Sequence, residues 1–288
     1  LLLSSAASDV YKRQIIEQVP YFAEMAEEFL KNTAGVVFIG TSVPVSFFAY
    51  PDKKSYLLPT ETKIINLCSP NQDGHDALNA LSAESGSSSI NQDLIQSSII
   101  DIPTSGILDT SSFGPLLAGL MPENAIVSDE SATSSLCVTS HTLSAKPHDW
   151  LALTGGSIGQ GLPLAVGAAI AKPDRPVITL HGDGGAMYTI QALWTQAREN
   201  LNITNIIFAN NSYEILKIEL DRVGAVQTGE RAESMLSLEN PKINWPQLSK
   251  SMGVPSYAPT SIEEFTKIFT QCINCLLYTS DAADESSS

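Results

Sequence analysis

One carboxylate stands among glycines in the stretch VITLHGDGGAMYTIQALW, residues 177–194. Asp183 follows a run of β-branched residues that predicts a strand, and the residues after it have the apolar spacing of a helix. The flanking Gly184 and Gly185 allow another molecule close to the backbone, and a helix N-terminus offers unpaired N–H groups to an anion. A carboxylate beside an anion is repulsive unless a cation lies between them. The stretch therefore predicts a site for a metal ion and a phosphate group.

A second oxygen ligand is expected from the next strand, TNIIFAN, which ends at Asn210, 27 residues after Asp183. Parallel strands joined by one crossover end at the same edge of a sheet, where open α/β sheets bind ligands. A carboxylate, an amide oxygen and the backbone carbonyl of Ser212 are hard donors that suit Mg²⁺ or Ca²⁺. Asn211 makes the amide ligand ambiguous by one position, and the 27-residue offset favours Asn210.

The elements that must position these residues alternate along the chain. Apolar strand patterns are followed by helical ones, which predicts an α/β fold with a doubly wound parallel sheet. The expected strands are NAIVSDES, DWLALTGG, PVITLHGD and TNIIFANN, and the expected helices are SSFGPLLAGLM, LPLAVGAAIAK, residues 186–200 and a helix starting near residue 213.

A separate region is expected before the sheet. Residues 15–85 contain an amphipathic helix and two continuous apolar strands, VVFIG and TKIINLC, which suggest the end of another α/β domain. The Ser-rich stretch ESGSSSINQD starts at residue 84, and residues 86–106 are expected to be a linker. Residues 107–274 then form the domain that carries the site.

The two ends of the chain are expected to be translated sequencing adapter rather than natural protein. SSAASDVYKRQ, within residues 1–14, and CLLYTSDAADE, within residues 275–288, can be read from opposite strands of one inverted DNA sequence. That DNA sequence resembles a transposon-end adapter. Both ends are therefore excluded from the fold prediction, and the natural portion is expected to be a piece of a longer protein.

Composition narrows the class of protein. The net charge of −15, without a basic stripe, argues against nucleic-acid binding. No apolar run reaches the roughly 18 residues that a membrane-spanning helix needs. Cys68, Cys137 and Cys272 are widely spaced and indicate neither a disulfide framework nor a zinc site. These features favour a cytoplasmic protein, although they carry no information on organelle targeting.

The motifs together resemble a known family. GDG followed after about 25 residues by NN is similar to the signature of thiamine-diphosphate (ThDP) enzymes. LTGGSIGQGLPLAVGAAIA before it and SYEILKIELDRVGA after it resemble the acetolactate synthase large subunit and benzoylformate decarboxylase branch. The resemblance covers residues 105–274 as the pyrophosphate-binding domain. It extends more weakly over residues 15–85 as the end of a Rossmann-like central domain.

The resemblance implies a role for each matching residue. Asp183, Asn210 and the Ser212 carbonyl become Mg²⁺ ligands. Ile158 falls where the family keeps a bulky apolar residue beneath the bent cofactor, and the Gly156 carbonyl where the 4′-amino group is bound. The diphosphate is expected to meet the hydroxyl of Thr133 and the backbone amides of Gly184, Gly185 and Ala186.

The resemblance also implies an activity. It favours decarboxylation of a 2-oxo acid with transfer of the product to a second oxo acid, in a homodimer or tetramer. Decarboxylation without ligation is the alternative in the same chemistry. In this family the activating glutamate lies on an N-terminal domain, so no complete catalytic set is expected here, and the chain alone is expected to bind cofactor weakly and to show no turnover. The identity of the 2-oxo acid and the presence of FAD stay open.

Other interpretations use the same residues. The glycines of GGSIGQG also suit a dinucleotide-binding turn for NAD or FAD, with Asp183 lying 22 positions after Gly161 as the ribose ligand. A non-catalytic cofactor-binding relic is a further alternative. His148 and His181 lie near the expected site, but isolated histidines are more often structural than catalytic.

Overall fold

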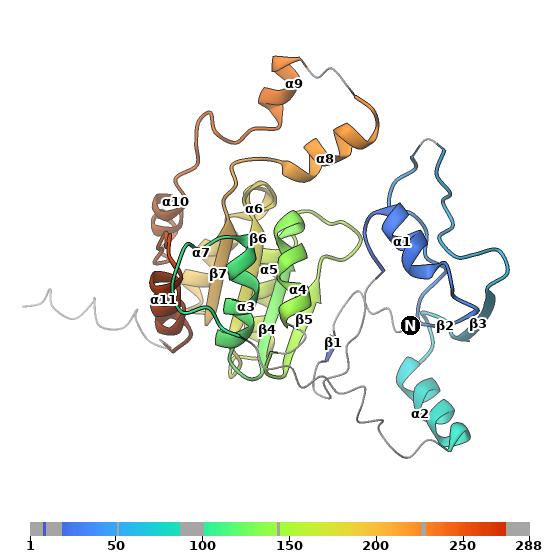
Figure 1. Ribbon diagram of the computed structural model, residues 1–288. Helices are drawn as coiled ribbons and strands as arrows, with labels where there is room; N and C mark the ends of the chain where they lie inside the picture. Colours follow the sequence, from blue (N-terminus) through green and yellow to red (C-terminus); the bar gives the residue numbers. More distant parts are fainter. Residues whose placement is uncertain are drawn as a thin grey trace, which may run out of the picture. The chain divides into compact units, whose positions relative to one another are not determined.

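The computed structural model describes residues 8–9, 19–50, 52–86, 101–142, 145–225 and 229–274 (Figure 1). These residues divide into two compact units. The smaller unit contains residues 19–86, and the larger unit contains the remainder.

The larger unit is built on a five-stranded sheet. Its strands lie in the order β1 (Ser8–Asp9), β5 (His148–Ala152), β4 (Ala125–Glu130), β6 (Val177–Gly182) and β7 (Ile203–Phe208). The pairs β5–β4, β4–β6 and β6–β7 are parallel, and only β1 is antiparallel to its neighbour. Four parallel strands therefore direct their carboxyl ends to one edge of the sheet.

Helices cover both faces of this sheet (Figure 1). On one face, α3 (Thr110–Leu120) and α11 (Ile262–Asn274) enclose a core with Val127, Ile178 and Leu180. On the other face, α5 (Gly161–Ala171) packs its Ala165 and Ala169 against Ile126 and Val177. The alternation of side chains along β4 and β6 supplies both cores. The predicted doubly wound parallel sheet is thus confirmed.

The helix expected over residues 186–200 is wrong in its bounds. The structure has two helices there, α6 (Asp183–Thr189) and α7 (Ala192–Arg198). The chain turns tightly between them, where Leu193 N–H bonds to Ile190 O and Trp194 N–H to Gln191 O. No glycine or proline marks this turn, so the apolar periodicity continues through it.

The remaining elements of the larger unit are short. They are a 3₁₀ helix η3 (Ala132–Cys137), α4 (Thr139–Thr142), α8 (Glu214–Arg222), α9 (Glu230–Met235) and α10 (Trp245–Ser251). The segment that carries α8 and α9 is closed at its base by two backbone bonds, from Tyr213 N–H to Leu236 O and from Leu238 N–H to Asn211 O.

The smaller unit has two parallel strands, β2 (Gly35–Ile39) and β3 (Lys63–Cys68), with α1 (Ala23–Leu30) and α2 (Gly74–Ser85). Its small core joins residues of α1 to Leu57. The first four residues of β3 are exposed, and α2 has no buried residue. Most of the expected linker (residues 87–100) and both expected adapter segments, except 8–9, lie outside the described residues.

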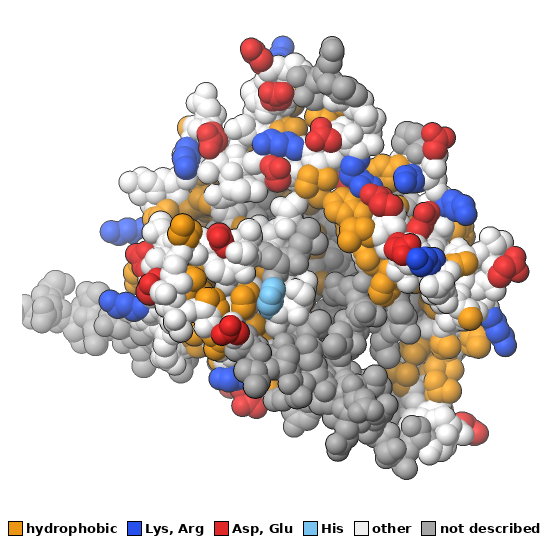
Figure 2. All heavy atoms as spheres, in the orientation of Figure 1, with side chains coloured by type: hydrophobic (Ala, Val, Ile, Leu, Met, Phe, Trp, Pro, Cys, Tyr) orange, Lys and Arg blue, Asp and Glu red, His pale blue; other side chains and the backbone are white. Residues whose placement is uncertain are grey.

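Among the described residues, no helix combines the length and apolarity that a membrane crossing requires. On the face drawn in Figure 2, the Lys and Arg side chains of the described residues are scattered among Asp and Glu side chains and form no continuous stripe.

Candidate functional site

The ends of β6 and β7 lie side by side. These strands are neighbours, and Gly182 is in register with Phe208. Beyond the paired residues, Asp183 Oδ2 accepts a hydrogen bond from Asn211 N–H at 2.6 Å. The structure therefore brings together the two strand ends whose proximity the sequence predicts.

Asp183 is buried at the first position of α6. Only 2 % of the residue is exposed, and its Oδ1 accepts a hydrogen bond from Gly184 N–H at 2.8 Å. Burial raises the pKa of Asp183, although the amides of Asn211 and Gly184 oppose this shift. A buried carboxylate is costly without a positive partner. A divalent cation at its free lone pairs would supply one.

The three residues after β7 use their polar groups differently. Asn210 is exposed, and its Oδ1 accepts a hydrogen bond from Ser212 N–H at 3.0 Å. Asn211 has a left-handed backbone with φ of 56°, and its side-chain Nδ2 donates to Ala209 O at 3.4 Å. Asn211 thus acts on Asp183 through its backbone N–H. The sequence does not indicate this role.

Ser212 is fixed by a backbone bridge to Ser237. The bonds of this bridge run through the flanking residues, Tyr213 to Leu236 and Leu238 to Asn211. The carbonyl of Ser212 therefore takes no part in the pairing and is left for a ligand. The candidate metal ligands Asp183, Asn210 and Ser212 all lie at this edge of the sheet.

The glycines of the β6–α6 turn are required for space. A Cβ atom on Gly184 would lie 2.7 Å from Cδ1 and Cε1 of Tyr213. Three backbone amides were expected to bind phosphate. The N–H of Gly184 donates to Asp183 Oδ1. Ala186 is the fourth residue of α6, where the N–H of a regular helix donates to the carbonyl of the N-cap residue, here Gly182. Gly185 is therefore the best placed of the three to bind an anion.

The β5–α5 loop presents the other predicted cofactor residues. Gly155, Gly156 and Gly159 have φ angles of 62°, 68° and 91°. Gly156 O accepts a hydrogen bond from Ile158 N–H at 2.9 Å, and its second lone pair can still accept an amino group. Ile158 is 56 % exposed, so its apolar side chain is available to support a flat ring.

Glu130 is a site residue that the sequence analysis does not identify. Its Oε1 accepts a hydrogen bond from Gly159 N–H at 2.5 Å, and its Oε2 accepts one from Gly161 N–H at 2.6 Å. Burial acts to raise the pKa of Glu130, but His181 and the two amides hold it below its usual value. The available signal was an acidic residue at the end of the apolar strand in the motif DESATSS.

The histidines and Thr133 take different places. Thr133 is half-buried in η3, directly after β4. His181 is fully buried next to Glu130, with Nε2 3.0 Å from Glu130 Oε2. His148 begins β5 and so lies at the amino edge of the sheet, away from Asp183. His148 is therefore not brought to the candidate site.

The donor set fits a magnesium ion and a diphosphate-bearing cofactor. One buried carboxylate, one amide oxygen and one backbone carbonyl are the hard oxygen ligands that Mg²⁺ accepts. A dinucleotide turn fits less well. β4 lies between β5 and β6, so Asp183 does not end the strand next to the glycine loop, as a ribose ligand would.

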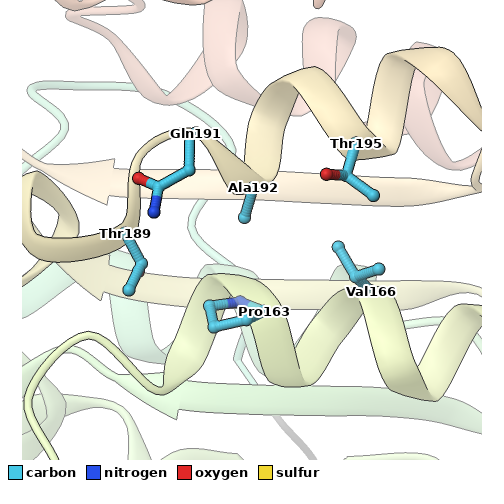
Figure 3. A pocket seen from close by; sticks show the side chains of 6 residues that line it. All are labelled: Pro163, Val166, Thr189, Gln191, Ala192 and Thr195. Carbon is cyan, nitrogen blue, oxygen red and sulfur yellow. The ribbon is translucent and has the colours of Figure 1, made fainter.

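A hollow of about 200 Å³ lies elsewhere on the larger unit (Figure 3). Side chains of α5 face those of α7 across it, and none of the predicted site residues lines it. The lining residues are Pro163, Val166, Thr189, Gln191, Ala192 and Thr195.

Comparison with known families and sequences gives consistent matches. Residues 132–279 match the model of the thiamine pyrophosphate enzyme, C-terminal TPP-binding domain. The chain is 44 % identical over 251 residues to the acetolactate synthase large-subunit-like protein IlvX of Mycobacterium tuberculosis; this match covers 87 % of the chain and 48 % of that protein. It is 35 % identical over 102 residues to benzoylformate decarboxylase of Pseudomonas aeruginosa, covering 35 % of the chain and 19 % of that enzyme. The chain thus spans about half the length of IlvX, which it matches over the longer stretch.

Solved structures share the fold. A ThDP-dependent 4-hydroxybenzoylformate decarboxylase of Rhodococcus jostii superposes with a TM-score of 0.71 at 24 % identity, covering 93 % of this chain and 52 % of that one. Benzoylformate decarboxylase of Polynucleobacter necessarius superposes with a TM-score of 0.60 at 19 % identity, covering 86 % and 48 %.

Proposed function

Because the chain belongs to the thiamine pyrophosphate enzyme family through its C-terminal TPP-binding domain, we propose that its sheet edge binds Mg²⁺ and the diphosphate of ThDP. The protein would then decarboxylate a 2-oxo acid. The observation that carries this proposal is the hydrogen bond between Asp183 and the end of β7, in which Asp183 Oδ2 accepts from Asn211 N–H at 2.6 Å. This contact supports the proposal because it joins Asp183 to the residue that lies between Asn210 and Ser212.

The residues of this chain would act by binding and positioning. Asp183, Asn210 and the Ser212 carbonyl would hold the metal ion, and Gly185 N–H would bind a phosphate oxygen. Ile158 and the Gly156 carbonyl would orient the ring end of the cofactor. ThDP, when bound, would supply a carbon nucleophile and an electron sink for the bonding pair that stays behind when carbon dioxide leaves.

We favour carboligation over simple decarboxylation. The support is the 251-residue similarity to an acetolactate synthase large-subunit-like protein, which is longer than the 102-residue similarity to benzoylformate decarboxylase. Simple decarboxylation remains the second candidate because both known structures described above are benzoylformate-type decarboxylases.

Cofactor binding is tested on the 288-residue chain by titration calorimetry with ThDP at millimolar concentrations, with and without Mg²⁺. We expect Mg²⁺-dependent binding that Asp183→Asn weakens by at least about 100-fold, beyond what loss of a metal's supporting contacts usually causes. Asp174→Asn removes an exposed carboxylate from the α5–β6 connection and serves as the matched control. Equal binding with and without Mg²⁺, or by the two variants, would refute the metal site.

The reaction is tested on the full-length protein with pyruvate. Formation of acetolactate would support ligation, whereas acetaldehyde alone would support simple decarboxylation. The resemblance implies that the activating glutamate lies outside this chain, so we expect the 288-residue chain to show no turnover with pyruvate or benzoylformate. Turnover by the chain alone would contradict that expectation.

A further inference from the structure

A buried acid–histidine pair lies between the two turns of the candidate site. Glu130 ends β4, and His181 is the corresponding residue of the neighbouring β6. Both are at least nine-tenths buried, and they lie on the face of the sheet that α5 covers, as Ser128 does through its bond to Gly161 O at 2.8 Å. A pair of ionisable groups at this depth is costly to keep, so its contacts require a reason.

The carboxylate of Glu130 is matched to the β5–α5 loop. Its two oxygens accept separate hydrogen bonds from Gly159 N–H and Gly161 N–H, at 2.5 and 2.6 Å. Only an ionised carboxylate offers two acceptor oxygens with no donor. Hydrogen bonds to a charged acceptor are also shorter and stronger than neutral ones. The loop segment between these two amides is thus fixed on both sides just after Ile158.

The other side of the pair touches the β6–α6 turn. A Cβ atom on Gly185 would lie 3.0 Å from Glu130 Oε1 and 3.0 Å from His181 Cε1. A Cβ atom on Gly161 would lie 2.8 Å from His181 Cδ2. Glu130 and His181 therefore fill the space between the β5–α5 loop and the β6–α6 turn so closely that neither glycine could carry a side chain there.

His181 packs against Glu130 and against the β6–α6 turn. Its Nδ1 lies 2.9 Å from Gly182 O, a carbonyl that can only accept a hydrogen bond. Its Nε2 lies 3.0 Å from Glu130 Oε2 but is not aligned as a hydrogen bond. The imidazole is thus anchored to the residue just before Asp183 while it contacts the carboxylate that holds the loop.

We propose that Glu130, with His181 packed against it, is a positioning residue that sets the Gly156–Ile158 loop at a fixed distance from Asp183. This inference rests on the proposed function. It assigns to Glu130 the positioning of the loop that would bind the ring end of the cofactor, separately from the diphosphate end at the metal site. Glu130 itself touches neither end.

Glu130→Gln tests the proposal with little change in volume. Gln keeps one acceptor oxygen, but its NH₂ group meets the second glycine N–H donor to donor. In Glu130→Asp the charge remains, but the shorter side chain does not reach both amides. Asn205→Ala is the matched control, because it removes the Asn205 Nδ2 to Gln196 Oε1 bond of 2.6 Å between β7 and α7. This control lowers stability without touching the loop.

Two measurements on the 288-residue chain separate positioning from stability. The first is hydrogen exchange of the peptide covering residues 155–162 without ligand. In the wild type the Gly159 and Gly161 amides should be protected, and both Glu130 variants should exchange them at least about tenfold faster, as expected for loss of a charged hydrogen bond. The second is the ratio of the affinities for Mg²⁺–ThDP and Mg²⁺–pyrophosphate. We expect Glu130→Gln to reduce this ratio about tenfold and Asn205→Ala to leave it unchanged.

Each outcome decides the matter. Rapid exchange of the two amides in the wild type would overturn the proposal even if no variant folds. An equal loss of ThDP and pyrophosphate affinity, or no loss, would overturn the positioning role and leave the proposed function intact. A wild-type chain that binds neither ligand would overturn the proposed function and this inference together.

Discussion

Two turns at the same sheet edge use glycine for different physical reasons. In the β5–α5 loop, Gly155 adopts φ of 62°, and a Cβ atom there would meet nothing within 4 Å. In the β6–α6 turn, Gly184 does not have a positive φ, but its Cβ atom would lie 2.7 Å from the ring of Tyr213. The first glycine is needed for its backbone conformation and the second for its lack of a side chain.

This difference shows what substitution should do at each turn. A left-handed position tolerates Asn, whose short polar side chain also visits that region. A crowded position tolerates no larger side chain until its neighbour is removed. Stability lost on replacing the glycine should therefore be restored differently at the two turns: by Asn at the left-handed position, and by removal of the neighbouring side chain at the crowded one.

Among the glycine substitutions at the two turns, Gly184→Ala is expected to lower the stability of the protein most. The new methyl group would overlap Cδ1 and Cε1 of Tyr213, and the Tyr213 backbone is tied by its N–H to Leu236 O at 3.0 Å. We expect a loss of about 1–3 kcal/mol in the free energy of unfolding, as for other overpacked sites. Urea unfolding would measure it.

The double variant Gly184→Ala with Tyr213→Ala is the control. Removal of the ring should make the alanine at 184 nearly neutral, so the double-mutant cycle should give a coupling of at least about 0.5 kcal/mol. Additive losses would mean that the ring is not what requires glycine at this position.

Asn210→Ala sharpens the comparison at the end of β7. If its Oδ1 binds the metal, we expect Mg²⁺-dependent ThDP affinity to fall at least about 10-fold, which is the least that loss of a supporting contact usually costs. Asn211→Gly keeps the left-handed backbone and the N–H bond to Asp183, so it should bind nearly as the wild type. Calorimetric titration of both variants decides between them. Loss of binding in Asn211→Gly alone would assign the ligand to Asn211.

Gly155→Ala should have a smaller effect than Gly184→Ala. Its Cβ atom has free space, so only the left-handed backbone is strained, at a cost of about 1–2 kcal/mol. Gly155→Asn should recover most of that loss because Asn tolerates this conformation. Thermal unfolding of both variants would measure the difference. If alanine and asparagine were equally unfavourable, the backbone argument would be wrong for this loop.

The adjacency of β6 and β7 was predictable from the sequence. The apolar runs of β6 and β7 are six residues each, and one crossover links them, so their adjacency follows from simple chain geometry. The same reasoning was less successful for β3 in the smaller unit. KIINLC is as apolar as β6, yet its first four residues are exposed, because the described part of that unit has a sheet of two strands and few buried helix residues. An apolar run predicts a strand but does not by itself predict what covers it.

The missed parts of the candidate site depend on contacts between distant segments. Glu130 lies 29 residues from Gly159, and its pairing with the loop amides leaves no local sequence pattern. The backbone role of Asn211 and the break between α6 and α7 are similar, since neither was recognisable as a pattern in the sequence. Sequence patterns located the side chains that could bind a metal ion, whereas the residues that support them required coordinates.

The smallest expected effect lies at the opposite edge of the sheet, at His148. This residue is 4 % exposed, and burial lowers its pKa although Lys146 O and Asp149 oppose the shift. Because the unfolded chain binds the proton more readily, stability should be lost as pH falls below the ordinary histidine value of about 6.5 toward the lowered folded pKa. His148→Asn removes this proton uptake and can still donate to Lys146 O, so its melting temperature should fall less than that of the wild type. We expect the difference in melting temperature between the two proteins to change by no more than about 2–4 °C over this pH range.

ThDP affinity measured at neutral pH should be the same in both proteins, because His148 lies away from both glycine turns. A parallel pH dependence of the two melting temperatures would contradict the buried, uncharged state of His148.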